Sequence, residues 1–213
     1  MEETILIAEK VRSPMVGGMF YPEDDTEARA RISGFGVKRK TGGHAGAIVA
    51  PHGAWDISGK IAGDAFFAAG GRFSPGGGAG VSRVVALGPI HGAVGPGVFL
   101  SDSDYFETPL GRLPVDLRMG DEILSRDSRF ELNDIPHLRE HSLEVLLPFI
   151  KYCFPETSIV PILMGGSQPA LISALAAVLR TVFEPLMSDT LLVVSCNLSV
   201  NNDAGRAKTQ AEA

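Results

Sequence analysis

The sequence predicts one α/β domain over residues 1–213, with a central, mostly parallel or mixed sheet flanked by helices. Two observations support this fold class. Short continuous runs of Val, Ile and Leu alternate with segments of helical periodicity, and such runs are typical of strands covered on both faces. With 45% hydrophobic and 21% charged residues, the chain has the composition of a globular protein and the length for one substantial core.

The first half of the chain begins with a loop pinned by Phe20 and Tyr21. A helix is expected over 25–34, with Asp25 as its N-cap and Gly34 at its end. Further elements follow in order: a strand at 47–50, a helix at 58–71, a Gly-rich loop at 72–82, a strand at 84–87 and another at 98–100.

The second half opens with a hairpin over 105–116, because Thr-Pro-Leu-Gly is a turn sequence between two short apolar runs. Leu143, Leu146, Leu147 and Ile150 give the helix at 141–154 one apolar face, which Pro148 kinks or breaks. The other expected elements are a helix at 116–127, a strand at 158–166, a helix at 168–183 with Pro169 in its first turn, and a last buried strand at 190–199.

Charge and composition argue against several classes of partner. The net charge is -6 and the sequence has no Lys/Arg cluster, so we expect no nucleic-acid binding. The apolar runs are too short to cross a bilayer, and the N-terminus has no signal-peptide pattern. Cys153 and Cys196 form no C-x-x-C pair, which favours a reducing, cytoplasmic location, with Cys153 in the core.

Two strands end in the same way. His52 follows the first buried strand after a proline, and His91 follows the second after Pro89. The turn at 195–197 comes directly after the last strand, and the carboxyl ends of parallel strands meet at one edge of a sheet. Imidazole is a common ligand of Fe, Cu and Zn, but two histidines make an incomplete site. A single histidine after a strand is more often a turn residue bonded to the backbone than a ligand, and it is the paired placement that favours a ligand role.

A third set of polar residues lies at Glu140 and His141. These residues are expected at a helix start, where Glu140 favours the helix dipole and Ser142 can cap the helix. The alternative is that Glu140 and His141 act as a catalytic acid and base. Trp55 either walls a binding pocket or packs against the aromatic residues of the first loop. Two other histidines have no partner in the sequence and are expected at the surface: His44 and His137.

The order of these motifs resembles the Memo family, also known as protein B of the AmmeMemoRadiSam system. The resemblance covers nearly the whole chain and rests on VRSPMVGGMFYP, IVAPHGAWDISGKIAGDAF, VVALGPIHG, FETPLGRLPVD, EHSLEVLLPFIKYCFPETSIVPILMG and LVVSCNLS. It implies a fold like that of the class III extradiol dioxygenases, which carry non-haem iron above a central sheet. It also implies that His52 and His91 occupy the family's metal-ligand positions.

The chain departs from the family pattern at the last strand. The family ends this strand with SSD-L-SH-Y, whereas here Asn197 replaces the Asp and Val200 replaces the His. The family also supplies a cysteine from a C-terminal segment that these 213 residues do not contain. Cys196 is either a substitute thiolate or a buried structural cysteine.

Two functions follow from the sequence. The first is weak binding of Fe, Cu or Zn in a strand-end cleft through His52 and His91, with an unknown reaction. The second is a non-catalytic module that binds a peptide or small ligand in the same cleft, lined by Trp55, Asn197 and Cys196. A shortened C-terminus would leave the last strand, 191–194, uncovered. We therefore expect self-association, or an altered local fold, with weak anchoring from Asn201 onward.

Overall fold

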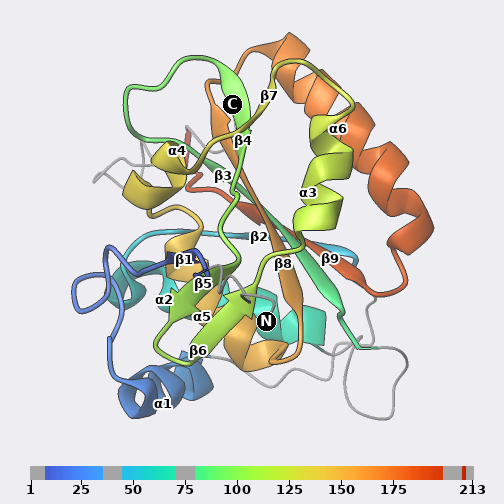
Figure 1. Cartoon of the computed structure of the whole chain (residues 1–213). Coiled ribbons are helices and arrows are strands. Elements are labelled where there is room, and N and C mark those ends of the chain that lie inside the picture. The colour runs from blue at the N-terminus through green and yellow to red at the C-terminus, as the bar shows by residue number, and fades with distance from the viewer. Residues whose placement is uncertain (1–7, 36–44, 71–79, 199–207, 210–213) are drawn as a thin grey trace, which may run out of the picture.

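The computed structural model of the chain describes residues 8–35, 45–70, 80–198 and 208–209 (Figure 1). Its main feature is a six-stranded sheet with the strand order β2-β9-β3-β8-β4-β7. The bounds of these strands are β2 Ala47–Ala50, β3 Arg83–Pro89, β4 Gly97–Leu100, β7 Phe130–Leu132, β8 Ser158–Gly165 and β9 Thr190–Ser195. The predicted single α/β domain with a central sheet is confirmed.

The sheet is mixed, as expected. Strands β2, β9, β3 and β8 run parallel to one another, and β4 is antiparallel to β8 but parallel to β7. The parallel strands β2, β9 and β3 lie side by side, so their carboxyl ends share one edge of the sheet. This arrangement brings together the turns at His52, at His91 and at 195–197.

Helices cover both faces of the sheet (Figure 1). On one face Phe66 of α2 and Phe149 of α5 pack in the same apolar cluster as Val84, whereas the neighbouring Val85 packs on the other face with Leu171. This alternation is the period-2 pattern of a strand buried on both sides. The helices are α1 Asp25–Phe35, α2 Trp55–Gly70, α3 Leu117–Leu124, α4 Asp134–Arg139, α5 Leu147–Cys153 and α6 Pro169–Phe183, with 3-10 turns at Glu144–Leu146 and Glu184–Leu186.

A second, smaller sheet has the order β1-β5-β6. The expected hairpin is present as β5 (Tyr105–Thr108) and β6 (Gly111–Pro114), and Gly111 adopts a φ of 112° in its turn. The two-residue strand β1 (Val11–Arg12), within a stretch predicted as loop, pairs in parallel with β5.

Several local predictions differ from the structure. Asp24, not Asp25, caps α1, because its Oδ1 accepts a hydrogen bond from the backbone N–H of Glu27 at 2.9 Å. The helix expected over 141–154 is a 3-10 turn followed by α5, and Pro148 lies in the first turn of α5, where no helical N–H is lost. The short elements β7 and α4 were not predicted. The Gly-rich loop lies mainly outside the described residues.

The prediction that the last strand has an uncovered edge is wrong, whereas the expected self-association stays a prediction. Strand β9 lies inside the sheet and pairs with β2 on one side and β3 on the other. The edge strands are β2 and β7, and Val49 on β2 is 57% exposed. Beside β2 and β9, on the face covered by α6, lies an apolar groove of about 500 Å³. Anchoring of the chain beyond residue 201 lies outside the described residues, apart from 208–209.

One helical stretch, Pro169–Leu186, is long and apolar enough to cross a membrane by length and composition alone. In this structure Leu171, Leu175, Val182 and Phe183 are buried in the cluster between α6 and the sheet. A core helix passes the same test, so this stretch is weak evidence for a membrane segment.

Candidate functional site

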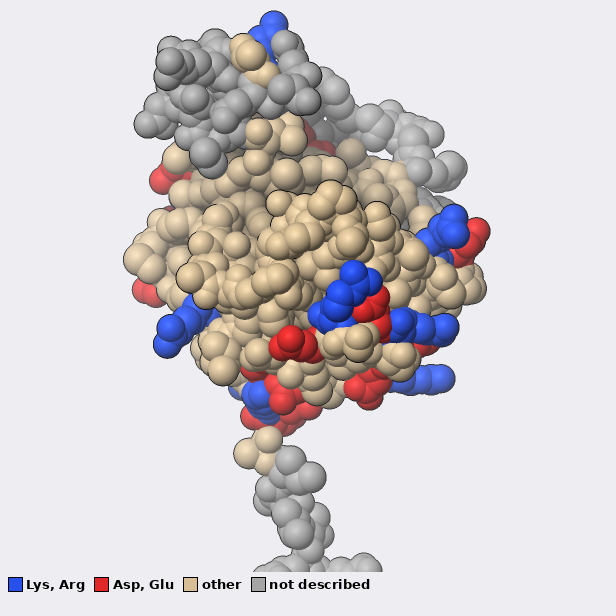
Figure 2. Space-filling view, turned by 90° about the horizontal axis from the view of Figure 1, so that it is seen from above, with Lys and Arg blue, Asp and Glu red and all other residues tan. Residues whose placement is uncertain are grey.

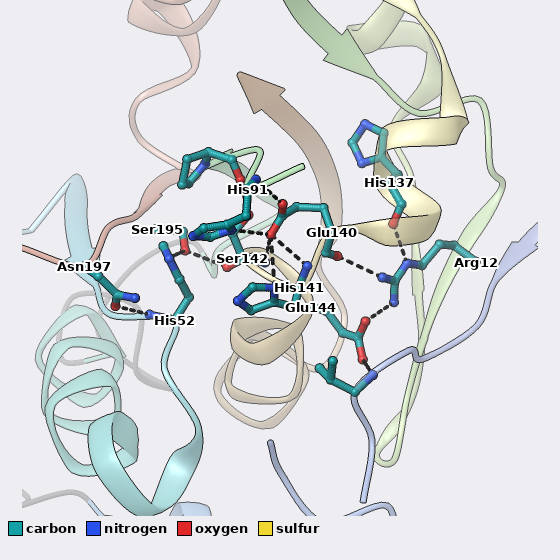
Figure 3. A network of polar contacts seen from close by, with 12 residues as sticks. Arg12, His52, His91, His137, Glu140, His141, Ser142, Glu144, Ser195 and Asn197 are labelled. Atoms are coloured by element: carbon teal, nitrogen blue, oxygen red, sulfur yellow. Dashed lines mark hydrogen bonds and ion pairs between the residues drawn. The ribbon is translucent and has the colours of Figure 1, made fainter. Parts of the chain in front are cut away.

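The carboxyl ends of three neighbouring strands and one connecting segment form a histidine-rich site. His52 follows β2, His91 follows β3, and Ser195 is the last residue of β9. The connecting segment, 140–142, lies between α4 and the next 3-10 turn. Figure 3 shows His52, His91 and His141 close to one another, with Ser195 next to His52 and Glu140 next to His91. The predicted convergence of His52, His91 and the turn after β9 is therefore present.

His52 is held from behind by a serine. Its Nδ1 lies 2.7 Å from Oγ of Ser195, and that hydroxyl also lies 2.6 Å from the carbonyl oxygen of Ser142. A carbonyl can only accept, so the single Ser195 proton goes to Ser142 and the Ser195 oxygen accepts from Nδ1–H of His52. In the neutral ring Nε2 then carries a lone pair. This Nε2 is buried and has no hydrogen-bond partner among the described residues.

His91 is held in a similar way by Glu140. Its backbone N–H donates to Oε2 of Glu140 at 2.6 Å, and its Nδ1 lies 2.9 Å from Oε1. An ionised carboxylate only accepts, so Nδ1 of His91 carries a proton. In the neutral ring, Nε2 of His91 also presents a lone pair. The same tautomer is therefore selected at His91 and at His52.

The Glu140 carboxylate is fully engaged. Besides the two donors of His91, its Oε1 accepts from the backbone N–H groups of His141 and Ser142, both at 2.8 Å. Burial opposes ionisation of Glu140, but the hydrogen bonds from His91 and Ser142 outweigh it and hold the pKa below its ordinary value. The expected cap by Ser142 is not formed: its Oγ donates to the carbonyl of Pro89 at 2.7 Å, and Glu140 caps the backbone instead.

His141 completes the group of three imidazoles. Its ring centroid lies 4.7 Å from that of His91 and 5.9 Å from that of His52, and the His52 and His91 centroids are 5.1 Å apart. Phe20, from the N-terminal loop, packs edge-on against the His141 ring at 5.1 Å. Burial lowers the pKa of His141, so its ring is neutral near pH 7.

Potential ligand atoms of His91, Glu140 and His141 lie within 4.8 Å of one another, a spacing that a metal ion could bridge. Glu140 already accepts four hydrogen bonds, three on Oε1 and one on Oε2, and these contacts argue for a supporting role within this group. Glu140 orients the ring of His91 by accepting from its Nδ1–H. In many metal-binding histidines a carboxylate holds the ring nitrogen that does not bind the metal in this way. The imidazole nitrogens are the available donors.

The three histidines of the site differ in their exposure to solvent. The His91 side chain is 48% exposed, His141 is 25% exposed, and His52 is only 1% exposed. Burial, with His91 and His141 nearby, lowers the pKa of His52 to about 4. His52 is therefore a neutral nitrogen donor at physiological pH. Solvent reaches the site from the side of His91.

The residues predicted to line a binding pocket have different positions. The side chain of Asn197 accepts a hydrogen bond from the backbone N–H of His52 at 3.1 Å, so it supports the His52 turn. Cys196 is half-buried, and no metal-ligand group among the described residues includes it. Cys153 is also free and half-buried, packed against the core. Val200 lies outside the described residues.

Trp55 belongs to the core and does not wall the site. Its side chain is 1% exposed and packs against Tyr21, Phe35 and Phe149, and its indole N–H donates to the carbonyl of Val145. Of the two interpretations of Trp55, packing against the N-terminal loop describes the structure. A pocket wall would require exposed ring surface, which Trp55 lacks.

The prediction that His137 lies on the surface is wrong. It is 2% exposed, and its Nε2 lies 3.0 Å from the carbonyl oxygen of Phe99. Burial lowers the pKa of His137 to about 4, so the ring is neutral and Nε2–H satisfies that carbonyl. His44 lies outside the described residues. Sequence reasoning also missed the buried ion pair of Arg12 and Glu144, which lies directly behind the segment 137–144.

The fold and the site define an α/β protein with a mixed central sheet and three imidazoles gathered at the carboxyl ends of its strands. A sequence model described as Memo-like protein matches residues 12–205. The chain is 31% identical to a MEMO1 family protein of Thermotoga neapolitana over 206 residues, which are 91% of this chain and 72% of that protein. It is 33% identical to a MEMO1 family protein of Desulfurococcus amylolyticus, over 84% of this chain and 64% of the relative. The chain belongs to the Memo family.

Proposed function

We propose that this protein binds a transition metal ion through Nε2 of His52 and Nε2 of His91. The observation that carries the proposal is the buried Nε2 of His52, which has a lone pair and no partner among the described residues. A polar atom buried without a partner is costly in a folded protein, and a metal ion would satisfy it. Neutral imidazoles suit Fe, Cu and Zn.

The residues around the two histidines are of the kind that supports a bound transition metal ion. Ser195 and Glu140 fix the ring nitrogens that face away from the site, as in other metal-binding histidines. A bound ion would supply Lewis-acid or redox chemistry. His141, neutral and next to His91, can accept a proton from a molecule bound beside it, and Glu140 would act only through the two histidines.

We propose that the site binds a small molecule or peptide, which enters past His91. Nucleic acid is a poor match, because the net charge is -6. On the face shown in Figure 2, blue and red side chains lie next to one another and form no broad basic area.

The cytoplasm is the proposed location, and the two free cysteines agree with a reducing compartment.

Ligand binding without chemistry is a second candidate. One observation favours it: Asn197 carries no charge, and its side-chain oxygen is already used by the backbone of His52. Such a site would keep its shape while lacking an acidic group at the end of β9. The two candidates differ in whether metal binding responds to a charge at position 197.

The direct test is metal content. Untagged wild-type protein, loaded in turn with Fe²⁺, Cu²⁺ and Zn²⁺ and then desalted, should retain one of these ions. The His52→Ala/His91→Ala double variant should lose it. His137→Gln is the matched histidine control, because His137 lies in the core and its replacement can still donate to Phe99. A wild-type protein that retains no more metal than the double variant contradicts the proposal.

A further inference from the structure

One motif of the sequence has no role in the proposed metal site: VRSPMVGGMFYP at residues 11–22. Its arginine, Arg12, lies on β1 in the small sheet and is 1% exposed. A fully buried arginine is rare unless its charge and its five N–H donors have partners. The partners of Arg12 therefore indicate what this strand does.

Arg12 binds one short segment at three points. Its Nε donates to the carbonyl of His137 and its Nη2 donates to the carbonyl of Glu140, both at 3.0 Å. Its Nη1 lies 2.6 Å from Oε2 of Glu144. The planar guanidinium thus holds the main chain at the end of α4, at His137 and Glu140, and pairs with the side chain of Glu144 at the start of the next turn (Figure 3).

Glu144 ties the same segment to the N-terminal loop. Its Oε1 accepts from the backbone N–H groups of Met15 and Val16, at 2.9 and 2.7 Å, and from the Tyr21 hydroxyl at 2.8 Å. Oε2 faces Arg12 in an ion pair without hydrogen-bond geometry, so both carboxylate oxygens have a partner of opposite polarity. The segment 137–144 is therefore fixed at Glu144 as well as at Glu140.

This fixed segment holds both histidines of the site. The side chain of Glu140 binds His91, and the carbonyl of Ser142 accepts from Ser195, which in turn binds His52. Arg12 contacts the backbone of Glu140 directly. A shift of that backbone would move the carboxylate away from His91, whereas the ring itself has no contact with Arg12.

We propose that Arg12 is a positioning residue of the histidine site. It holds the backbone of Glu140 so that the carboxylate keeps the His91 ring in its Nδ1–H tautomer, with Nε2 free. The functional consequence for metal affinity rests on the proposed function, but the effect on His91 does not. On this view the small sheet serves to bring Arg12 beneath the segment 137–144. The competing view is that Arg12 and Glu144 only stabilise the fold.

The test is Arg12→Lys in the full chain. Lysine keeps the charge beside Glu144 but cannot form the three-point fork. Arg83→Lys is the matched control, because Arg83 forms a partly buried pair with Asp116 at the opposite end of β3. Nitrogen-15 NMR of the metal-free protein should show one tautomer of His91 in wild type and Arg83→Lys, and mixed tautomers in Arg12→Lys. Affinity for Co²⁺, measured by titration, should fall about tenfold only in Arg12→Lys.

The double variant Arg12→Met/Glu144→Gln is included in case Arg12→Lys does not fold. It removes both buried charges together and therefore leaves no unpaired charge in the core. Its glutamine oxygen can still accept from the N-terminal loop. If either folded Arg12 variant keeps the wild-type tautomer of His91, the proposal is overturned and Arg12 is structural. If wild type binds no Co²⁺ but the tautomer changes with Arg12, the positioning role stands and the metal function fails.

Discussion

His91 and the carboxylate of Glu140 contact each other twice: the His91 backbone N–H donates to Oε2 at 2.6 Å, and the imidazole Nδ1 lies 2.9 Å from Oε1. The two residues are 49 positions apart in the sequence, so this contact joins the end of β3 to the segment after α4. Glu140 therefore holds both the ring and the main chain of His91. The orientation of His91 therefore depends on a single carboxylate.

Glu140→Gln tests that dependence. Both carboxylate oxygens accept from N–H donors, so an amide NH₂ must face at least one of them. We expect unfolding free energy to fall by about 1–3 kcal/mol. Metal affinity should fall by about 10- to 100-fold, because the His91 ring loses the carboxylate that orients it. Glu107→Gln, at a half-buried position of β5 outside the histidine site, is the control for both denaturant unfolding and metal titration. Equal affinities in the two variants would show that Glu140 does not orient His91.

Ser195→Ala tests the support of the second histidine. The change leaves Nδ1–H of His52 and the carbonyl of Ser142 without their shared hydroxyl partner, in a buried position. We expect a loss of about 1–3 kcal/mol in unfolding free energy. Ser33→Ala, at an exposed position of α1, should change stability little. A Ser195→Ala protein as stable as Ser33→Ala would contradict the hydrogen-bond assignment.

The sequence was sufficient to predict five of the six strands of the main sheet, because strands such as β3 and β8 are buried on both faces and appear as continuous apolar runs. It also indicated His52 and His91, because each follows a buried strand. The partners of these histidines could not be predicted, since Glu140 and Ser195 reach them only through the folded chain. Helix α4 was missed because its six residues include Pro136 and leave Ile135 and Leu138 exposed, which hides any apolar period.

The burial of His137 makes stability depend on pH. Its pKa is lowered from 6.5 to about 4 in the fold, so between these values the unfolded chain binds more protons than the folded one. The stabilising contribution is present above about pH 6.5 and is lost as the pH falls toward about 4. From pH 7 to pH 5 the loss attributable to this residue is about 2 kcal/mol.

The measurement is denaturant unfolding of wild type and His137→Gln over that pH range. His52 titrates in the same direction in both proteins, so the difference between their slopes isolates His137. We expect a flatter pH dependence for His137→Gln. Parallel curves for the two proteins would mean that His137 does not titrate with a lowered pKa.

Gly88→Ala tests the close approach of β3 to the segment behind the site. A Cβ at Gly88 would lie 2.7 Å from Oγ of Ser142 and 2.8 Å from a methyl carbon of Leu143. Overpacking of this kind costs about 1–3 kcal/mol. The displaced Ser142 should also weaken metal binding, because its carbonyl holds Ser195. Gly34→Ala is the control: nothing lies within 4 Å of its added Cβ, so α1 should keep or gain stability. Similar losses in both variants would argue against this contact.

Asn197→Asp separates metal binding from ligand binding without chemistry. Aspartate keeps the oxygen that accepts from the backbone of His52 and adds a negative charge at the end of β9. If the site holds a metal ion, affinity should rise on the order of tenfold, because a nearby carboxylate attracts the cation. Asn133→Asp is the matched control, since Asn133 accepts from the backbone N–H of Ile135 at the start of α4, outside the histidine site. Titration of both variants with Zn²⁺ decides the question, and an affinity unchanged from wild type in Asn197→Asp would favour the binding module.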